Sequence, residues 1–284
     1  MTHPLRTHLE AVGTALRHPA MAERVHEAPT AALGPPATEA MVADLERDLG
    51  QALPAGVRTV LLRVSAKASF DWSLKRRTWL ADEGYLASEA LVRPPDAFME
   101  WDRAPFPDGT PVPGASLGPS IWGGGLEFSL DTIRQAALGV PGWLDVYGEE
   151  GAGDDADLQE HFGVLRAFMR RGVPVMTAPN GDWVAVEAET GRVLHVSHEG
   201  EEAGIVFDLD FTGFLTHLAW LGPVHPDFPE LFAFSGETVA EAGDDRVRRA
   251  AFDAAGEKGT LWRDWFWTGT DLPAPDASLL RRLA

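Results

Sequence analysis

The sequence predicts helices arranged around an antiparallel β-meander, and the clearest evidence lies between residues 173 and 221. Asn180-Gly181 separates an apolar run from an alternating one, and this pair tolerates the positive φ angles of a tight hairpin turn. A second turn signal, Glu189-Thr190-Gly191, precedes a third run in which alternate residues share one face of a strand. The two turns predict three consecutive strands, each paired with the next.

The meander is predicted to continue through a short strand at residues 205–207 into an amphipathic helix. Five apolar residues of that segment recur at helical spacing: Phe211, Phe214, Leu215, Leu218 and Leu221. Asp208 or Asp210 is placed to cap this helix, and Gly222-Pro223 ends it.

Two helices are predicted before the meander. The first runs from a cap near Thr2 to about His26, on apolar residues spaced three to five apart. Residues 28–37 form a linker, and the second helix opens at Thr38 and ends at Gly50. The expected buried stripe of this second helix is Met41, Leu45 and Leu49.

The middle of the chain predicts two more strands and a helix. Residues 65–74 alternate like an edge strand, and residues 126–130 alternate like a half-buried one. The glycines at 123–125 match no phosphate-loop pattern, so a bulge or a close backbone approach is the better interpretation. A helix follows over residues 131–138 and is interrupted at residues 139–142, which contain Gly and Pro.

Two long segments are predicted to lie outside this framework. Residues 75–120 are rich in proline and read as an insertion or covering loop. Its aromatic residues are expected to anchor it to the core: Trp79, Tyr85, Phe98, Trp101 and Phe106. Residues 223–284 contain a predicted helix at 244–255 and an aromatic block at 261–267. That block should pack back onto the domain, because exposed apolar area costs roughly 25 cal/mol per Å².

Composition excludes several classes of protein. The chain has no cysteine, which removes disulfides, thiolate zinc sites and a cysteine nucleophile. Its formal net charge of −19 argues against a nucleic-acid surface. Residues 140–221 hold fifteen Asp and Glu against four Arg and no Lys, a net charge of −11. This charge would steer a basic partner toward the region. A requirement for solubility alone also accounts for it. Because no apolar run reaches the length of a signal peptide or a membrane span, we expect a cytoplasmic protein that does not bind membranes.

No strong catalytic or metal-binding pattern emerges. Ser116 lies in a G-x-S-x-G match, but it lacks the preceding strand and following helix of a nucleophile elbow. His195 and His198 would point to opposite faces of a strand, so metal binding by this pair with Asp208 or Asp210 is not expected. The four histidines of the first 26 residues share no helix face and are expected on the surface. A hydrolase that uses Ser116 or a His198 metal site remains the alternative interpretation.

Several short elements stand in the order and spacing of one family. In the second half they are Gly181-Asp182-Trp183-Val184, Thr190-Gly191-Arg192-Val193, His198-Glu199-Gly200 and Phe211-Thr212-Gly213-Phe214-Leu215. The opening elements are Thr38-Glu39, Leu45-Glu46, Leu49-Gly50 and Leu53-Pro54. This pattern resembles the SUKH superfamily, which contains bacterial toxin-immunity proteins and yeast cell-wall regulators. The usual Asn-Gly after the second helix is absent.

The resemblance implies an α+β domain with a mixed or antiparallel sheet flanked by helices, and it makes residues 57–64 helical. It divides the chain into an N-terminal helical segment (1–35), a SUKH-like domain (36–222) and a C-terminal extension packed on it (223–284). It also implies protein binding without catalysis, as an immunity protein or a general adaptor, with no cofactor and no metal. An acidic loop is the expected contact for a protein partner such as a basic toxin domain: Glu149, Glu150, Asp154, Asp155 and Asp157.

Overall fold

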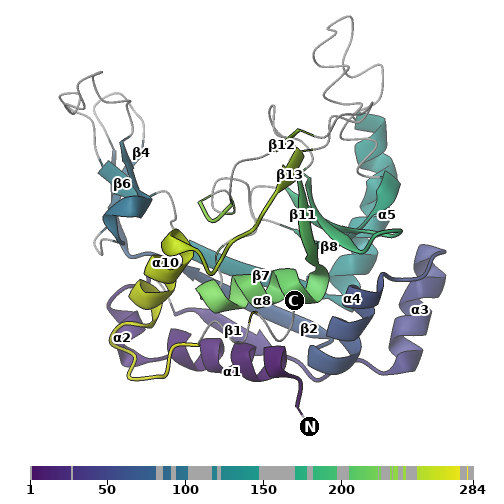
Figure 1. Cartoon of the computed structure of the whole chain (residues 1–284), viewed down its shortest axis with the longest axis horizontal. Coiled ribbons are helices and arrows are strands. Elements are labelled where there is room, and N and C mark those ends of the chain that lie inside the picture. Colours follow the sequence, from purple (N-terminus) through teal and green to yellow (C-terminus); the bar gives the residue numbers. More distant parts are fainter. Residues whose placement is uncertain are drawn as a thin grey trace, which may run out of the picture.

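The computed structural model of the chain shows two larger β-sheets with helices packed around them (Figure 1), which confirms the predicted α+β class. One sheet is antiparallel with strand order β1-β2-β7, and the other is mixed with order β12-β13-β11-β10-β9-β8. The structure describes residues 2–26, 28–80, 86–90, 94–101, 117–119, 123–146, 170–177, 182–196, 205–222, 224, 231, 233–235, 239–240, 248–275 and 280.

The predicted meander forms most of the mixed sheet. Strands β8 (Gly172–Thr177), β9 (Trp183–Glu187), β10 (Arg192–Val196) and β11 (Ile205–Asp210) pair antiparallel in sequence order. Gly191 has a φ of 74° in the turn between β9 and β10, as that turn signal predicts. The Asn180-Gly181 turn lies outside the described residues, but the pairing of the strands on either side of it confirms the hairpin.

Helix α8 (Phe211–Leu221) follows β11 and lies at the centre of the molecule (Figure 1). Asp210 caps it by accepting a hydrogen bond from the Gly213 amide at 2.7 Å. It contacts the mixed sheet and three other helices, so its residues are buried on nearly every side, and the amphipathic prediction is wrong. Its polar positions tolerate burial because their hydroxyls donate to backbone carbonyls, as Thr216 does to Thr212 at 2.7 Å.

Gly222, which ends α8, provides a direct test of this packing. Its φ is 88°, and a Cβ there would lie 2.4 Å from the Phe266 ring. We expect Gly222→Ala to lower the free energy of unfolding by about 2–3 kcal/mol, because it adds backbone strain to a steric clash. Chemical denaturation measures the loss. Gly191→Ala is the matched control, since its φ is 74° but its Cβ would meet no atom within 4 Å. Equal losses in both variants would show that the Phe266 contact is absent.

The N-terminal segment forms two helices rather than the single predicted one. Helix α1 (Pro4–Leu16) ends before Pro19, which begins α2 (Pro19–Ala22), because a proline ring cannot continue the preceding helix. The cap of α1 is His3 rather than Thr2, and its Nδ1 accepts a hydrogen bond from the Leu5 amide. His8 is buried at 7% exposure against α8 and α10, so the expectation that all four histidines lie on the surface is also wrong.

The antiparallel sheet consists of β1 (Thr30–Leu33), β2 (Lys67–Ser73) and β7 (Gly123–Ser129). Strand β2 alternates in burial as predicted, but it is the central strand and not an edge. β1 falls within the predicted linker, whose short apolar run gives no clear strand signal. Gly123 confirms the close backbone approach, since a Cβ there would lie 2.4 Å from the Trp72 carbonyl oxygen.

Helix α3 (Glu39–Leu49) has the predicted caps, with Thr38 before it and Gly50 at a φ of 68° after it. Val42 and Leu45 face the core, whereas Met41 is 43% exposed, so the predicted stripe is wrong at that residue. The following segment is helical as expected, as α4 (Ala55–Thr59) and a π-helical turn, η1 (Val60–Val64).

Helix α5 (Leu130–Val146) runs through Pro141 without the predicted interruption. It packs against β8 and α3, and this tertiary contact outweighs the low helix propensity of Gly139 and Pro141. None of the helices in the described segments combines the length and apolar character that crossing a membrane requires.

The 75–120 segment contains two short antiparallel pairs in its described parts. One consists of β3 (Arg76–Leu80) and β4 (Leu86–Ala90), and the other of β5 (Met99–Trp101) and β6 (Leu117–Pro119). A 3₁₀ turn, η2 (Asp96–Phe98), places Phe98 in the core at 1% exposure, which confirms it as an anchor. The other four predicted anchors have side chains outside the described residues.

The C-terminal segment contributes to the mixed sheet. Strand β13 (Arg248–Ala250) pairs parallel to β11 and antiparallel to β12 (Val239–Ala240). The prediction of a helix at 244–255 is therefore wrong for residues 248–255, which are the part of it that the structure describes. Helix α10 (Glu257–Trp267) packs against α8, and Trp262, Phe266 and Trp267 are buried as predicted for the aromatic block.

Candidate functional site

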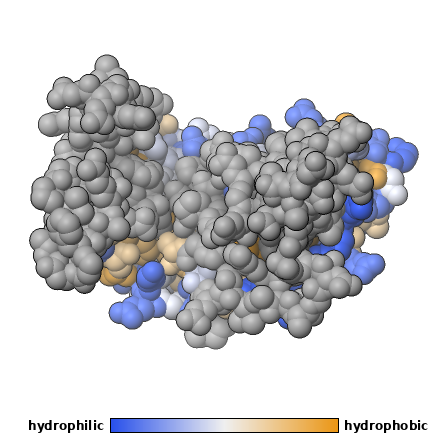
Figure 2. All heavy atoms as spheres, turned by 90° about the horizontal axis from the view of Figure 1, so that it is seen from above, coloured by the Kyte–Doolittle hydropathy of each residue, from blue (hydrophilic) through white to orange (hydrophobic). Residues whose placement is uncertain are grey.

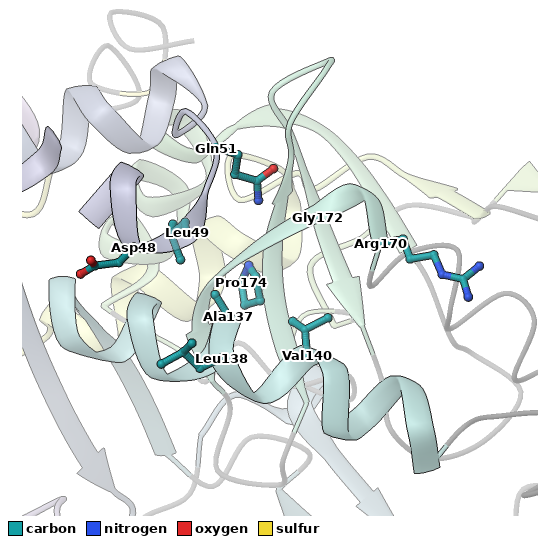
Figure 3. A pocket seen from close by; sticks show the side chains of 9 residues that line it. All are labelled: Asp48, Leu49, Gln51, Ala137, Leu138, Val140, Arg170, Gly172 and Pro174. Carbon is teal, nitrogen blue, oxygen red and sulfur yellow. The ribbon is translucent and has the colours of Figure 1, made fainter. Parts of the chain in front are cut away.

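A groove lies between the C-terminal end of α3, the middle of α5 and the start of β8 (Figure 3). Its volume is about 250 Å³, and it is called the α3–α5–β8 groove below. Its lining residues are Asp48, Leu49, Gln51, Ala137, Leu138, Val140, Arg170, Gly172 and Pro174. Leu49, Ala137 and Pro174 lie together at its centre, whereas Asp48 and Arg170 point outward at opposite ends (Figure 3).

The local sequence explains each wall of the groove. Gly50 takes a left-handed conformation that ends α3 after Leu49 and turns the chain toward Gln51. Pro174 has no amide hydrogen to donate, and it is tolerated because β8 is the edge strand of its sheet. The β8–β9 register shifts between Pro174 and Met176, so the ladder is irregular beside the groove.

One cluster of charges fixes the α3 side of the groove. Arg134 of α5 donates to Asp48 of α3 at 2.8 Å and to Asp131 at 2.9 Å. The contact with Asp48 ties the two helical walls together, whereas Asp131 lies one turn away on α5 itself. At the other end, Arg170 is exposed and has no ion-pair partner in the described part of the chain.

The groove is smaller than a typical site for a small molecule. Its volume is below the range of roughly 300–1,000 Å³ that is typical of small-molecule pockets. Its lining surface is more polar than apolar, and Leu138 is 67% exposed at its mouth.

The structure brings together a histidine and a carboxylate that the sequence analysis did not connect. His195 Nε2 lies 3.2 Å from Asp182 Oδ2, and both side chains are only 1% exposed. The β9–β10 hairpin places both residues on the same face of the meander, and that register was the signal in the sequence. Solvent therefore does not reach this pair in the structure.

The metal site considered for His195 also involves His198, which the structure does not describe. Asp210 caps α8, and Asp208 lies 3.9 Å from Arg192. No group of three or more His, Cys, Asp or Glu suited to a metal ion occurs in the segments that the structure describes. His198 lies outside those segments, as does Ser116.

The predicted partner-binding residues also lie outside the described residues: Glu149, Glu150, Asp154, Asp155 and Asp157. In the sequence they stand between α5, which ends at Val146, and β8, which begins at Gly172. These two elements form two walls of the groove. The acidic segment and the groove are therefore neighbours along the chain.

Comparison with protein-family models, curated proteins and solved structures found no match to this chain. The likeness to SUKH proteins thus rests on the residues quoted above and stays a prediction.

Proposed function

We propose that this chain is a non-enzymatic protein-binding module of the immunity-protein type, which binds a basic partner such as a toxin domain. The observation that carries the proposal is the concentration of acid between residues 140 and 221, with a net charge of −11 in a chain of −19. Such a field attracts a basic protein and speeds its association.

The order of elements supports the proposal. A capped α3 is followed by an antiparallel meander and an Asp210-capped closing helix, in the order in which the SUKH-like elements stand in the sequence. Proteins of that family bind other proteins, so the resemblance and the charge favour the same function. We also place the protein in the cytoplasm, where a chain without cysteine loses nothing in a reducing environment.

Within the acidic region, residues 149–157 contain five carboxylates and no basic residue. We assign the main electrostatic contact with the partner to them: Glu149, Glu150, Asp154, Asp155 and Asp157. Charges near an interface mainly change the association rate and the salt dependence of binding. The contribution of this segment should therefore be strongest at low ionic strength.

Reversing those five charges to lysine is expected to reduce partner recovery about tenfold or more at low salt. The measurement is affinity purification of tagged chains from lysate of the host, with quantitative mass spectrometry. A control carries the same number of reversals at exposed acids elsewhere: Glu10, Glu23, Asp44, Glu127 and Glu257. A partner recovered equally by both variants and by the unmodified chain would show that the acidic segment does not bind it.

A further inference from the structure

The interface between α1, α8 and α10 contains buried polar atoms without a hydrogen-bond partner. Figure 1 shows α1 along the lower edge of the molecule, below α8, and both α1 and α10 contact α8. In the described part of the chain, no partner is present for His8 Nε2 of α1, Trp220 Nε1 of α8, or the Nε1 atoms of Trp262 and Trp267 of α10. Because burial removes the hydrogen bonds that such atoms make with water, they weaken this α1–α8–α10 interface.

His8 is the member of this group that can become charged. Its side chain is 7% exposed, and its ring stacks on Trp267 at a centroid distance of 6.2 Å. Burial lowers its pKa to about 4, against a smaller opposing effect of a hydrogen bond with the Ala219 backbone. Protonation places a positive charge in the interface and adds a hydrogen to Nε2, which has no acceptor among the described residues.

Among the described residues, no charged group compensates for that charge. Apart from His8, the titratable side chains of the three helices and of the turn after α10 are Arg6, Glu10, His217, Glu257, Lys258, Arg263, Asp264 and Asp271. Arg6 pairs with Glu10 at 3.0 Å, and Arg263 pairs with Asp264. None of these groups shifts the pKa of His8, on which burial and the Ala219 backbone act.

We propose that the α1–α8–α10 interface is an acid-sensitive switch, in which protonation of His8 releases α1 from α8 and α10 while the two sheets stay paired. Below pH 6.5 the released helix binds a proton that the packed helix does not, so release becomes more favourable as the pH falls. Segments near a chain end open at a lower free energy than core strands, and α1 begins at Pro4. This inference goes beyond the proposed function and does not depend on it.

Release of α1 exposes apolar side chains that are now buried. Leu5, Leu9, Val12 and Leu16 of this helix are each at most 1% exposed. Seen from above, the described hydrophobic residues occupy small areas of the surface (Figure 2). A dye that fluoresces on exposed apolar surface should therefore report the release.

Hydrogen exchange of the unmodified chain, expressed as protection factors at pH 7 and pH 4, tests where the chain opens. We expect the protection of the α1 amides to fall about a hundredfold, which is the ratio that a pKa change from 6.5 to 4 produces. The protection of β9 and β10 should fall much less. Equal falls in α1 and in these two strands would overturn the inference, because the chain would then open as a whole.

His8→Leu should reduce the pH dependence of α1 protection to that of β9 and β10, because it removes the titrating ring and keeps an apolar side chain. Val12→Ala is the matched control, since it removes buried volume from the same helix and retains His8. It should lower α1 protection at both pH values and leave the hundredfold ratio unchanged. Dye fluorescence between pH 7 and pH 4 should follow the same pattern.

A hundredfold fall that persists in His8→Leu would overturn the inference, as would a fall that Val12→Ala abolishes. If His8→Leu does not fold, titration of the His8 ring by nuclear magnetic resonance in the unmodified chain decides the question. A pKa of about 4 that coincides with the loss of α1 protection supports the switch, whereas a pKa of about 6.5 overturns it.

Discussion

Replacing Trp262 by alanine is expected to lower the free energy of unfolding by about 3–5 kcal/mol, because it removes the largest side chain of a buried aromatic cluster. Trp262 is fully buried. Its ring lies 5.1 Å from that of Phe98, 6.3 Å from those of Trp72 and Phe234, and 4.9 Å from that of Trp265. These partners come from the antiparallel sheet, the 75–120 segment and the C-terminal segment, so one residue joins three parts of the chain.

Urea denaturation followed by circular dichroism measures this loss. The control is Leu261→Ala, at the preceding position of α10 and 42% exposed, which should change stability by less than about 1 kcal/mol. A small effect of Trp262→Ala would contradict the account, since it would mean that residues 223–284 are an appended extension rather than part of the core.

Lowering the pH from about 6.5 to 4 is expected to destabilise the protein by about 3 kcal/mol through His8 alone. Burial lowers the pKa of His8 from 6.5 to about 4, against a smaller opposing effect of a hydrogen bond with the Ala219 backbone. The ring is stacked on Trp267 at a centroid distance of 6.2 Å. Below pH 6.5 the unfolded chain binds a proton at His8 that the folded chain does not. The free energy of unfolding therefore falls as the pH is lowered toward the folded pKa of His8. Above pH 6.5 the contribution of His8 to stability is fully present.

His8→Leu should abolish this part of the pH dependence and retain the packing of α1 on α8 and α10. The measurement is the free energy of unfolding at several pH values between 4 and 7, for the variant and the unmodified chain. His18→Asn, which keeps a capping side chain on α2, is the control for the removal of a histidine. Identical slopes for His8→Leu and the unmodified chain would contradict the assignment. Burial also lowers the pKa of His217. His217 therefore lowers the free energy of unfolding in the same direction as the pH falls, in every variant.

Local signals predicted much of this fold. The turn at Gly191, the caps Thr38 and Asp210 and the stop at Gly222 each depend on residues a few positions apart, and each appears in the structure as predicted. Strand alternation likewise identified β2, β7 and the meander, since half-buried strands reveal their faces in sequence.

Contacts between distant segments account for the failures. Strand β13 pairs parallel to β11 about forty residues away, and a three-residue strand has too little periodicity to compete with a helix prediction. Helix α5 continues through Pro141 because β8 and α3 hold it. Helix α8 is buried on its polar face because helices α1, α4 and α10 cover it, and none of these is near it in sequence.

The candidate site was only partly predictable for the same reason. The groove joins Leu49, Leu138 and Pro174, which are far apart in the chain, and no motif marks them. The acidic segment is visible in composition because its charges are consecutive, and its role in binding remains the proposal tested above. Asp182 and His195 needed the register of the β9–β10 hairpin before they could be connected.

The most direct test of the proposed function is the affinity of the purified chain for its recovered partner as a function of salt. Isothermal titration calorimetry should show that raising NaCl from about 50 to 500 mM weakens binding about tenfold or more, because screening removes the attraction between opposite charges. The reversal of the five carboxylates in residues 149–157 should remove most of that dependence. If the affinity of the unmodified chain does not change with salt, an electrostatic protein-binding function is contradicted.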